Sequence, residues 1–458
     1  MSELEKNIIS SLKAGPMSAA ELARGLRVDA TTITRRLSRM GAQVIKTGDG
    51  RATRWYVRRT LPMLPVLEVL PIYRVERNGA AGKMARLHIV YPDDSYLVEY
   101  FRVDDASGEA YAEWKFYESL PWWLSDMRPQ GFLGRSFAKR LRTEGVPLES
   151  DPNKWSEDDV LAVLAKFPQD HVGNLLVGDL AYTHWLQSAQ EAAISDQQAG
   201  AKAEAIARGE HFDSSAKGEQ PKFTTMLTEG ECIVKFSGHV TQTEIDSVAN
   251  RWADLLQAEA LAATALNGLV ADIAAHNRTF CVQGRTLLAS KRFDRTPEGG
   301  RVGVNSFSSL DSEFVGKANG NWPEIADTLY QQGVITENAV TQCKVAWAFG
   351  QLIANSDMHL GNVSALNWGG RPFELAPIYD MLPMHFSPNS AGDLPSEPYH
   401  IGFNPSVPKI CWQTAYAAAE DFWHHVLASG VISEHFKVLA KQQLQVVEQF
   451  AVTIKKMA

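Results

Sequence analysis

Asn355-Ser356-Asp357-Met358-His359-Leu360-Gly361-Asn362 is the stretch around which the rest of this 458-residue chain is organised. It carries a carboxylate at Asp357 and an amide at Asn362, five residues apart. The carboxylate can accept a proton from a hydroxyl group, and the amide oxygen is a ligand that Mg²⁺ accepts. Pro377-Ile378-Tyr379-Asp380 then adds a second carboxylate, Asp380, as a further metal ligand. This combination predicts a phosphoryl-transfer site.

The loop follows a segment with helical periodicity. Apolar residues from Val340 to Ile353 recur near helical spacing, so we expect one helix over 336–354 with a buried face. The polar residues that follow are also ordinary loop formers, as Asn, Ser, Asp and Gly are in many proteins. The catalytic interpretation therefore depends on the rest of a nucleotide site being present elsewhere in the chain.

Composition indicates a large cytoplasmic protein. The length suggests two to four domains, and 45% of the residues are hydrophobic. The four cysteines never form a Cys-x-x-Cys pair, which argues against a zinc site or a disulfide framework and favours a reducing compartment. The most apolar long stretch, 255–275, contains Glu259 and Asp272, so we expect a buried helix and no membrane partner.

The charge of the chain is unevenly distributed. Residues 1–60 carry 12 Lys and Arg against 5 Asp and Glu, although the whole chain has a net charge of −8. Short amphipathic segments around Ile8, from Ala19 and over 30–40 predict three helices, and the alternation on both sides of Gly48-Asp49-Gly50 predicts a β-hairpin. Three helices followed by a hairpin predict a winged helix-turn-helix.

The third helix and the wing supply candidate DNA contacts. In a winged helix-turn-helix the third helix enters the major groove, and wing residues contact the backbone. Arg58 and Arg59, at the end of the hairpin, would extend the wing contacts. A solvated basic face, or a module that contacts protein, is the alternative. The other expected DNA-binding residues are Thr31, Thr32, Arg35, Arg36, Arg39, Arg51 and Arg54.

Residues 61–210 show no evident chemistry. The alternation over 72–104 predicts strands, and the Ala-rich stretch 181–209 predicts a helix.

Residues 211–311 contain the pieces of a nucleotide site. Residues 214–222 form a small-residue loop with two lysines, whose amide and ammonium groups can approach phosphates. The apolar strand 232–236 carries Lys235, which can also be a surface residue. The helix expected over 249–265 carries Glu259, and burial of this carboxylate would require a partner, for which Lys235 is a candidate. A strand from Leu287 then enters the charged turn Arg292-Phe293-Asp294-Arg295.

In this order the motifs resemble the HipA-like serine/threonine kinases of bacterial toxin–antitoxin systems, and with a helix-turn-helix in front they resemble the YjjJ-type members. The resemblance covers about residue 71 to the C-terminus, and Pro221 and Lys217 depart from the family pattern. It implies that Asp357 is the catalytic base, that Asn362 and Asp380 hold Mg²⁺, and that Ser215, or Ser214 beside it, is autophosphorylated. The implied ATP-binding residues are Lys217, Gly218, Glu219, Gln220, Lys222, Lys235, Lys291, Arg292, Phe293, His359 and Tyr379.

The resulting fold prediction is α+β: a two-lobed, protein-kinase-like HipA-type fold with a mainly helical C-terminal lobe, preceded by the winged helix-turn-helix. The expected domains are residues 1–60, the HipA N-terminal subdomain 61–210, the nucleotide-binding part 211–311 and the helical lobe 312–458, where 412–429 and 432–458 predict two long helices.

The predicted function is an ATP- and Mg²⁺-dependent protein serine/threonine kinase that also binds duplex DNA. The resemblance implies a protein substrate such as an aminoacyl-tRNA synthetase or another translation factor. A homodimer stays open, because winged-helix proteins often dimerise on palindromic sites. One alternative is a DNA-binding transcriptional regulator whose kinase-like body senses nucleotide without catalysis. Another is a small-molecule kinase of similar fold.

Overall fold

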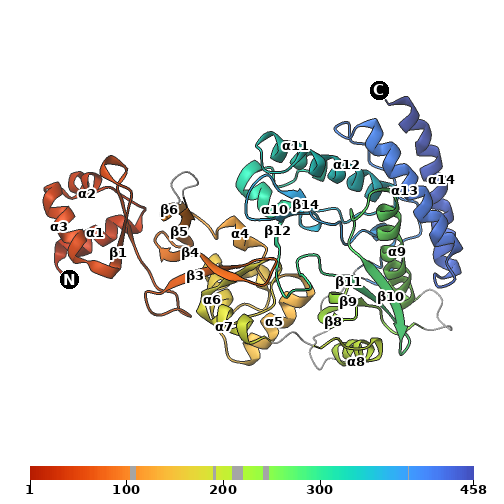
Figure 1. Ribbon diagram of the computed structural model, residues 1–458, viewed down its shortest axis with the longest axis horizontal. Coiled ribbons are helices and arrows are strands. Elements are labelled where there is room, and N and C mark those ends of the chain that lie inside the picture. The colour runs from red at the N-terminus through yellow and green to blue at the C-terminus, as the bar shows by residue number, and fades with distance from the viewer. Residues whose placement is uncertain (104–109, 189–191, 209–219, 241–246, 390, 458) are drawn as a thin grey trace. The chain divides into compact units, whose positions relative to one another are not determined.

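The computed structural model describes residues 1–103, 110–188, 192–208, 220–240, 247–389 and 391–457. The chain divides into two compact units, the first made of residues 1–129 and 141–189 and the second of 130–140 and 190–458. Both units mix helices and sheets (Figure 1). None of the helices in the described residues combines the length and hydropathy of a membrane-spanning segment.

The first unit begins with three helices and a two-stranded sheet, as the sequence predicts. The N-cap residues of the helices are Ser2, Ser18 and Asp29, whose side chains accept hydrogen bonds from the first turn. The strands pair antiparallel, with Val44 opposite Val57. Apolar side chains from all five elements form one buried cluster, so this module has its own core. The elements are α1 (Glu3–Lys13), α2 (Ala19–Leu26), α3 (Ala30–Arg39), β1 (Val44–Thr47) and β2 (Arg54–Val57).

Arg58 and Arg59 are not wing residues, which corrects the sequence-based prediction. Arg58 donates to the carbonyls of residues 67 and 68 at 2.7 and 2.8 Å. Arg59 is buried, and its Nη2 donates to Asp158 Oδ1 at 2.8 Å. The hydroxyl of Tyr96 also donates to Asp158 Oδ1, at 2.7 Å. The two guanidinium groups therefore fasten the N-terminal module to the rest of the first unit and are not available to phosphates.

A five-stranded antiparallel sheet is the centre of the first unit, with the strand order β6-β5-β4-β3-β7. Its strands confirm the prediction of β structure over 72–104. The elements are β3 (Val69–Val75), β4 (Ala81–Val90), β5 (Ser95–Val103), β6 (Ala110–Tyr117), α4 (Trp122–Ser125), α5 (Gly131–Thr143), α6 (Glu157–Lys166), β7 (Leu175–Val177) and α7 (Gly178–Gln187), with residues 131–140 of α5 assigned to the second unit.

The prediction of a single helix over 181–209 is wrong. The chain forms α7, which ends at Gln187, and a separate helix, α8 (Asp196–Ala207). Ser195 is the N-cap of α8: its side chain accepts from Gln198 N while the Gln198 side chain accepts from Ser195 N. This reciprocal capping box marks a helix start, and an Ala-rich composition conceals it.

The second unit contains a four-stranded antiparallel sheet in the order β10-β11-β9-β8. α9 contacts three of its strands, and Figure 1 shows this helix in green beside β9, β10 and β11. Phe223, Val234, Phe236 and Leu287 are buried in the core that the sheet shares with α8. The elements are β8 (Lys222–Leu227), β9 (Gly230–Phe236), α9 (Val248–Leu269), β10 (Asn277–Val282) and β11 (Arg285–Lys291).

Helices dominate the remainder of the second unit. α13 packs against α9, α12 and α14, and the predicted long helices are confirmed with small shifts of their ends. A three-stranded antiparallel sheet has the order β12-β13-β14, and its strands β13 and β14 follow the loop at 355–362. The elements are β12 (Gly303–Ser306), α10 (Phe307–Leu310), α11 (Trp322–Gln331), α12 (Glu337–Leu352), β13 (Ser364–Asn367), β14 (Glu374–Leu375), α13 (Lys409–Ala428) and α14 (Glu434–Lys456).

Candidate functional site

The stretch 355–362 forms a compact loop after α12. The amide N–H of Asp357 donates to the side-chain oxygen of Asn355 at 3.0 Å. The Nδ2 group of Asn362 donates a hydrogen bond to the carbonyl oxygen of Asp357 at 2.8 Å. This bond holds the two predicted residues close together in the loop. The Asp357 side chain is 51% exposed, and its Oδ1 lies 4.0 Å from His359 Nε2. The loop thus presents a carboxylate that an incoming hydroxyl group can reach.

Lys235 joins three elements at the centre of the site. Its ammonium group donates to both oxygens of Glu259, at 2.6 and 2.8 Å, and also contacts Asp380 Oδ1. Lys235 comes from β9, Glu259 from α9 and Asp380 from the segment after β14. Lys235 and Glu259 are both buried, and their ion pair confirms the partner that the sequence predicted for this carboxylate.

The charges in this cluster shift one another's protonation. Burial raises the pKa of Asp380, but the ammonium groups of Lys235 and Lys222 outweigh burial and lower it to about 2. Burial lowers the pKa of Lys235, whereas Asp380 and Glu259 raise it above its ordinary value. Burial raises the pKa of Glu259, although Lys235 acts in the opposite direction. At neutral pH Asp380 is therefore an anion and Lys235 a cation.

Asp380 and Asn362 fit Mg²⁺ by the chemistry of their donors. Mg²⁺ prefers oxygen ligands and usually takes only one or two carboxylates from a protein. The hydrogen bond from Asn362 Nδ2 fixes the amide, whose Oδ1 remains an oxygen donor. Within the described residues, no group of three or more His, Cys, Asp or Glu side chains could hold a metal ion.

Phe293 and Tyr379, two of the predicted ATP-binding residues, lie together. Their ring centroids are 5.9 Å apart. The Tyr379 hydroxyl donates to the Gly361 carbonyl at 2.9 Å and lies 2.7 Å from Ser364 Oγ, so this ring is fixed against the loop at 355–362. Ser364 was not among the predicted residues, and no local pattern in the sequence marks it.

The Arg292 side chain is enclosed by neighbouring charged side chains. Its guanidinium group is buried and forms two hydrogen bonds to Asp294, both of 3.0 Å. Arg295 contacts the same carboxylate at 2.8 Å. Glu231 lies 3.3 Å from Arg295 and joins the cluster. Lys291, beside Arg292, is exposed.

The loop over 214–222 lies mostly outside the described residues. Ser214, Ser215, Lys217, Gly218 and Glu219 are all in the part that the structure does not describe. The two remaining positions lie close to the centre of the site: the Gln220 side chain donates to the carbonyl of Phe236, and Lys222 is paired with Lys235 across β8 and β9.

The N-terminal candidates lie mostly on one exposed helix face. Arg36 is partly engaged, because its Nη1 lies 3.5 Å from Glu5 Oε1, and Arg54 Nη1 donates to the Thr53 carbonyl at 3.1 Å. Thr31, Arg35, Arg39 and Arg51 are exposed, and Thr32 is half-buried.

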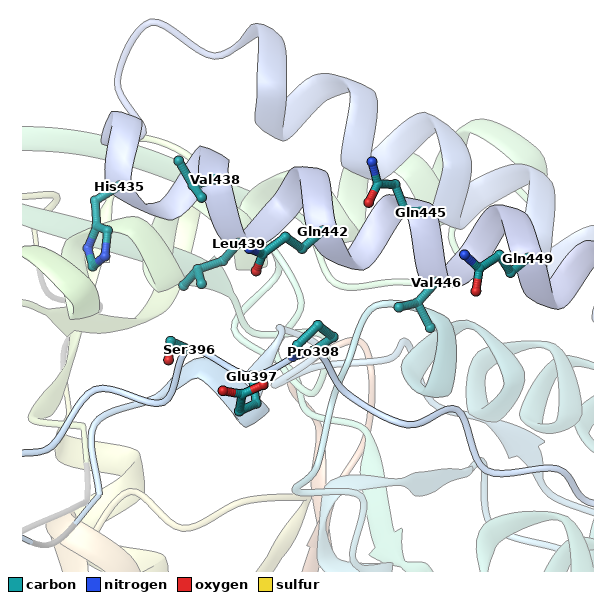
Figure 2. Close-up of a pocket in the computed structure, with 10 residues that line it drawn as sticks. All are labelled: Ser396, Glu397, Pro398, His435, Val438, Leu439, Gln442, Gln445, Val446 and Gln449. Atoms are coloured by element: carbon teal, nitrogen blue, oxygen red, sulfur yellow. The ribbon is translucent and has the colours of Figure 1, made fainter.

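A groove of about 500 Å³ lies between the segment 396–398 and α14 (Figure 2). None of the predicted site residues lines it. Its lining residues are Ser396, Glu397, Pro398, His435, Val438, Leu439, Gln442, Gln445, Val446 and Gln449.

Comparison with known families identifies the class of this chain. A family model described as the HipA-like C-terminal domain matches residues 214–449, and one described as the YjjJ-like toxin, middle domain, matches residues 66–186. The chain therefore belongs to the HipA-like family.

Within this family the chain belongs with the YjjJ toxins. It is 36% identical to the protein named Toxin YjjJ of Escherichia coli (strain K12) over 467 residues, which cover 100% of both chains. A shorter match, 39% identical over 98 residues, links 21% of this chain to 23% of the Putative kinase Y4dM of Sinorhizobium fredii (strain NBRC 101917 / NGR234).

Two solved structures are similar in part. The Shewanella oneidensis MR-1 HipA of a toxin–antitoxin complex with HipB and operator DNA gives a TM-score of 0.43 at 13% identity, over 84% of this chain and 99% of that chain. The Helicobacter pylori proinflammatory kinase CtkA gives 0.38 at 13% identity, over 54% of this chain and 95% of that chain.

Proposed function

We propose that the protein is an ATP- and Mg²⁺-dependent protein serine/threonine kinase of the HipA toxin type, with a two-lobed catalytic part formed by residues 211–458. The observation that carries the proposal is the meeting of Lys235, Glu259 and Asp380 beside the loop that holds Asp357 and Asn362. A buried Lys–Glu pair, a catalytic-loop aspartate and two oxygen ligands are the parts that phosphoryl transfer by kinases uses.

Each residue has a defined task in this proposal. Asp357 accepts the proton of the attacking hydroxyl group, which its exposed carboxylate can reach. Lys235, oriented by Glu259, offsets the negative charge of the phosphate groups. Asn362 and Asp380 would hold Mg²⁺, which supplies charge neutralisation when it is bound. Phe293 and Tyr379 would line the adenine end, because their rings lie together next to the catalytic loop.

The family supports a toxin with partners of its own. The proposal includes autophosphorylation at Ser215 or Ser214, a protein substrate of the translation machinery, and DNA or an antitoxin as partners. The DNA and antitoxin partners are proposed because the HipA neighbour is described as a complex with HipB and operator DNA. A cytoplasmic location is part of the same proposal.

Transfer of label from γ-labelled ATP tests the kinase. With Mg²⁺ the purified chain should label itself or an added protein acceptor, and chelation of Mg²⁺ with EDTA should stop the labelling, because Asn362 and Asp380 then have no cation to hold. Phosphoamino-acid analysis of the product identifies the acceptor hydroxyl. Nucleotide binding without labelling of any protein or small-molecule acceptor would instead support a nucleotide-sensing regulator.

We further propose that residues 1–60 are a winged helix-turn-helix that binds duplex DNA. The order of three helices and a strand pair supports this, as does the exposed face of α3 that carries Arg35 and Arg39. Replacing both arginines with alanine in the full chain should weaken binding to genomic duplex DNA and reduce the slope of log K against log salt by roughly 2.

The matched control for this DNA measurement is the double variant Lys455→Ala/Lys456→Ala. It removes the same charge from two exposed positions at the end of α14. An equal loss of DNA affinity in both double variants would show that only the net charge matters. It would contradict the proposal that α3 contacts the DNA.

A further inference from the structure

The catalytic loop begins at an unusual turn of the backbone. Ala354, which follows the C-cap of α12, has a φ of +63°, and Asp380 has a φ of +51°. Residues other than glycine seldom adopt this left-handed region, and they remain in it only where their surroundings hold them. Here the surroundings do so: Asn355 N donates to the Gly350 carbonyl at 2.8 Å, and His385 N donates to the Ala354 carbonyl at 3.0 Å.

Asn355 lies between these two left-handed residues and is only 2% exposed. Its Oδ1 accepts the amide N–H of Asp357 at 3.0 Å. Its Nδ2 points the other way and lies 3.5 Å from the carbonyl oxygen of Asp380 and 3.4 Å from the sulfur of Met381. One buried amide therefore contacts the backbone of both aspartates in the site.

The other side of the loop is held by packing. Met358, the neighbour of Asp357, lies against Gly350 of α12, and a Cβ atom at Gly350 would overlap the Met358 side chain. Gln351, which is also buried, donates to the Met358 sulfur at 3.8 Å. Because this packing restricts the loop on one side, a change at Asn355 would act mainly on the distance between Asp357 and Asp380.

We propose that Asn355 is a positioning residue that fixes Asp357 relative to Asp380 by bonding to the backbone of both. This inference rests on the proposed kinase function and adds a residue to it. Because Asn355 is only 2% exposed and bonds to the backbone of the two aspartates, its effect is on their geometry. A displacement of about 1 Å at a reacting group can cost about 10²-fold in rate.

The test compares Asn355→Ala and Asn355→Asp in the full chain. Asn355→Ala removes both contacts, and we expect the transfer rate to fall about 10²-fold with the affinity for ATP unchanged. Asn355→Asp keeps the acceptor for Asp357 N–H but replaces the donor to Asp380 with a buried carboxylate that faces the Asp380 carbonyl oxygen, so we expect transfer per folded molecule to fall in this variant as well. Hydrogen exchange of the Asp357 amide should accelerate in Asn355→Ala and remain slow in Asn355→Asp.

Asn404→Ala is the matched control. Asn404 is also buried, its Oδ1 accepts the amide of Ser406 at 2.9 Å, and its Nδ2 donates to Asn321 at 3.0 Å. A comparable loss of transfer in Asn404→Ala, or wild-type rate and wild-type exchange in Asn355→Ala, would overturn the inference. If the wild type transfers no label, the proposed function fails, and exchange of the Asp357 amide still decides whether Asn355 holds the loop.

Discussion

Replacing Lys235 with methionine should both destabilise the protein and abolish phosphoryl transfer. The substitution keeps most of the side-chain volume but leaves Glu259, which is 2% exposed, without its cation. Breaking a buried ion pair from one side costs about 3–5 kcal/mol, because the remaining charge is buried without compensation. Transfer should fall at least about 10²-fold per folded molecule, because the phosphate charge loses its fixed cation. Denaturant unfolding and label transfer measure the two effects.

The double variant Lys235→Met/Glu259→Leu separates stability from chemistry. It removes both charges of the buried pair, and the Asp380 side chain that remains is 32% exposed and accessible to water. We therefore expect most of the lost stability to return while transfer stays absent. If transfer returned with stability, Lys235 would have only a structural role.

Lys344→Met is the control for this series. Lys344 is also buried and pairs with Asp327 at 2.7 Å, between α11 and α12. We expect a loss of stability without a loss of transfer per folded molecule. A similar loss of transfer in Lys344→Met would show that a weakened fold, and not the removed cation, causes the effect of Lys235→Met.

Local patterns were sufficient for many of the elements. The helix expected over 336–354 is observed as α12 because its apolar spacing is regular and Thr336 caps its start. The ion pair of Lys235 and Glu259 was also predictable, since a carboxylate in an apolar helix needs a buried partner. Both predictions use information that lies within one element or follows from the rule that buried charges are paired.

Long-range contacts explain the failures. Arg59 looks like a wing residue because the chain around it is basic, but its partner Asp158 is 99 residues away. Arg292 differs from Arg59, because the Asp294 side chain that engages its guanidinium group is only two residues away, and only Glu231 of β9, at 3.9 Å, comes from a distant part of the chain. For Arg59 the sequence shows the charge and not its partner.

Asn355 is a mixed case. An asparagine two residues before an aspartate is a local turn signal, so its bond to the Asp357 amide could have been predicted. Its contact with Asp380, 25 residues later, depends on how the chain returns after β14. The assignments of ATP-binding and metal-binding residues stay predictions, because they concern ligands that no local contact can identify.

Replacing Asp357 with asparagine should reduce transfer about 10²- to 10⁴-fold, because the amide cannot accept the proton of the attacking hydroxyl group. Nucleotide affinity and stability should change little, since the Asp357 side chain is 51% exposed and the bonds that shape the loop use its backbone. Asp421→Asn is a close control: Asp421 is 54% exposed and also pairs with a histidine, His425, at 3.3 Å on α13. Loss of transfer in Asp357→Asn with full activity in Asp421→Asn would identify the base, because the two sites differ in position and not in local chemistry. Full activity in both variants would mean that another group accepts the proton.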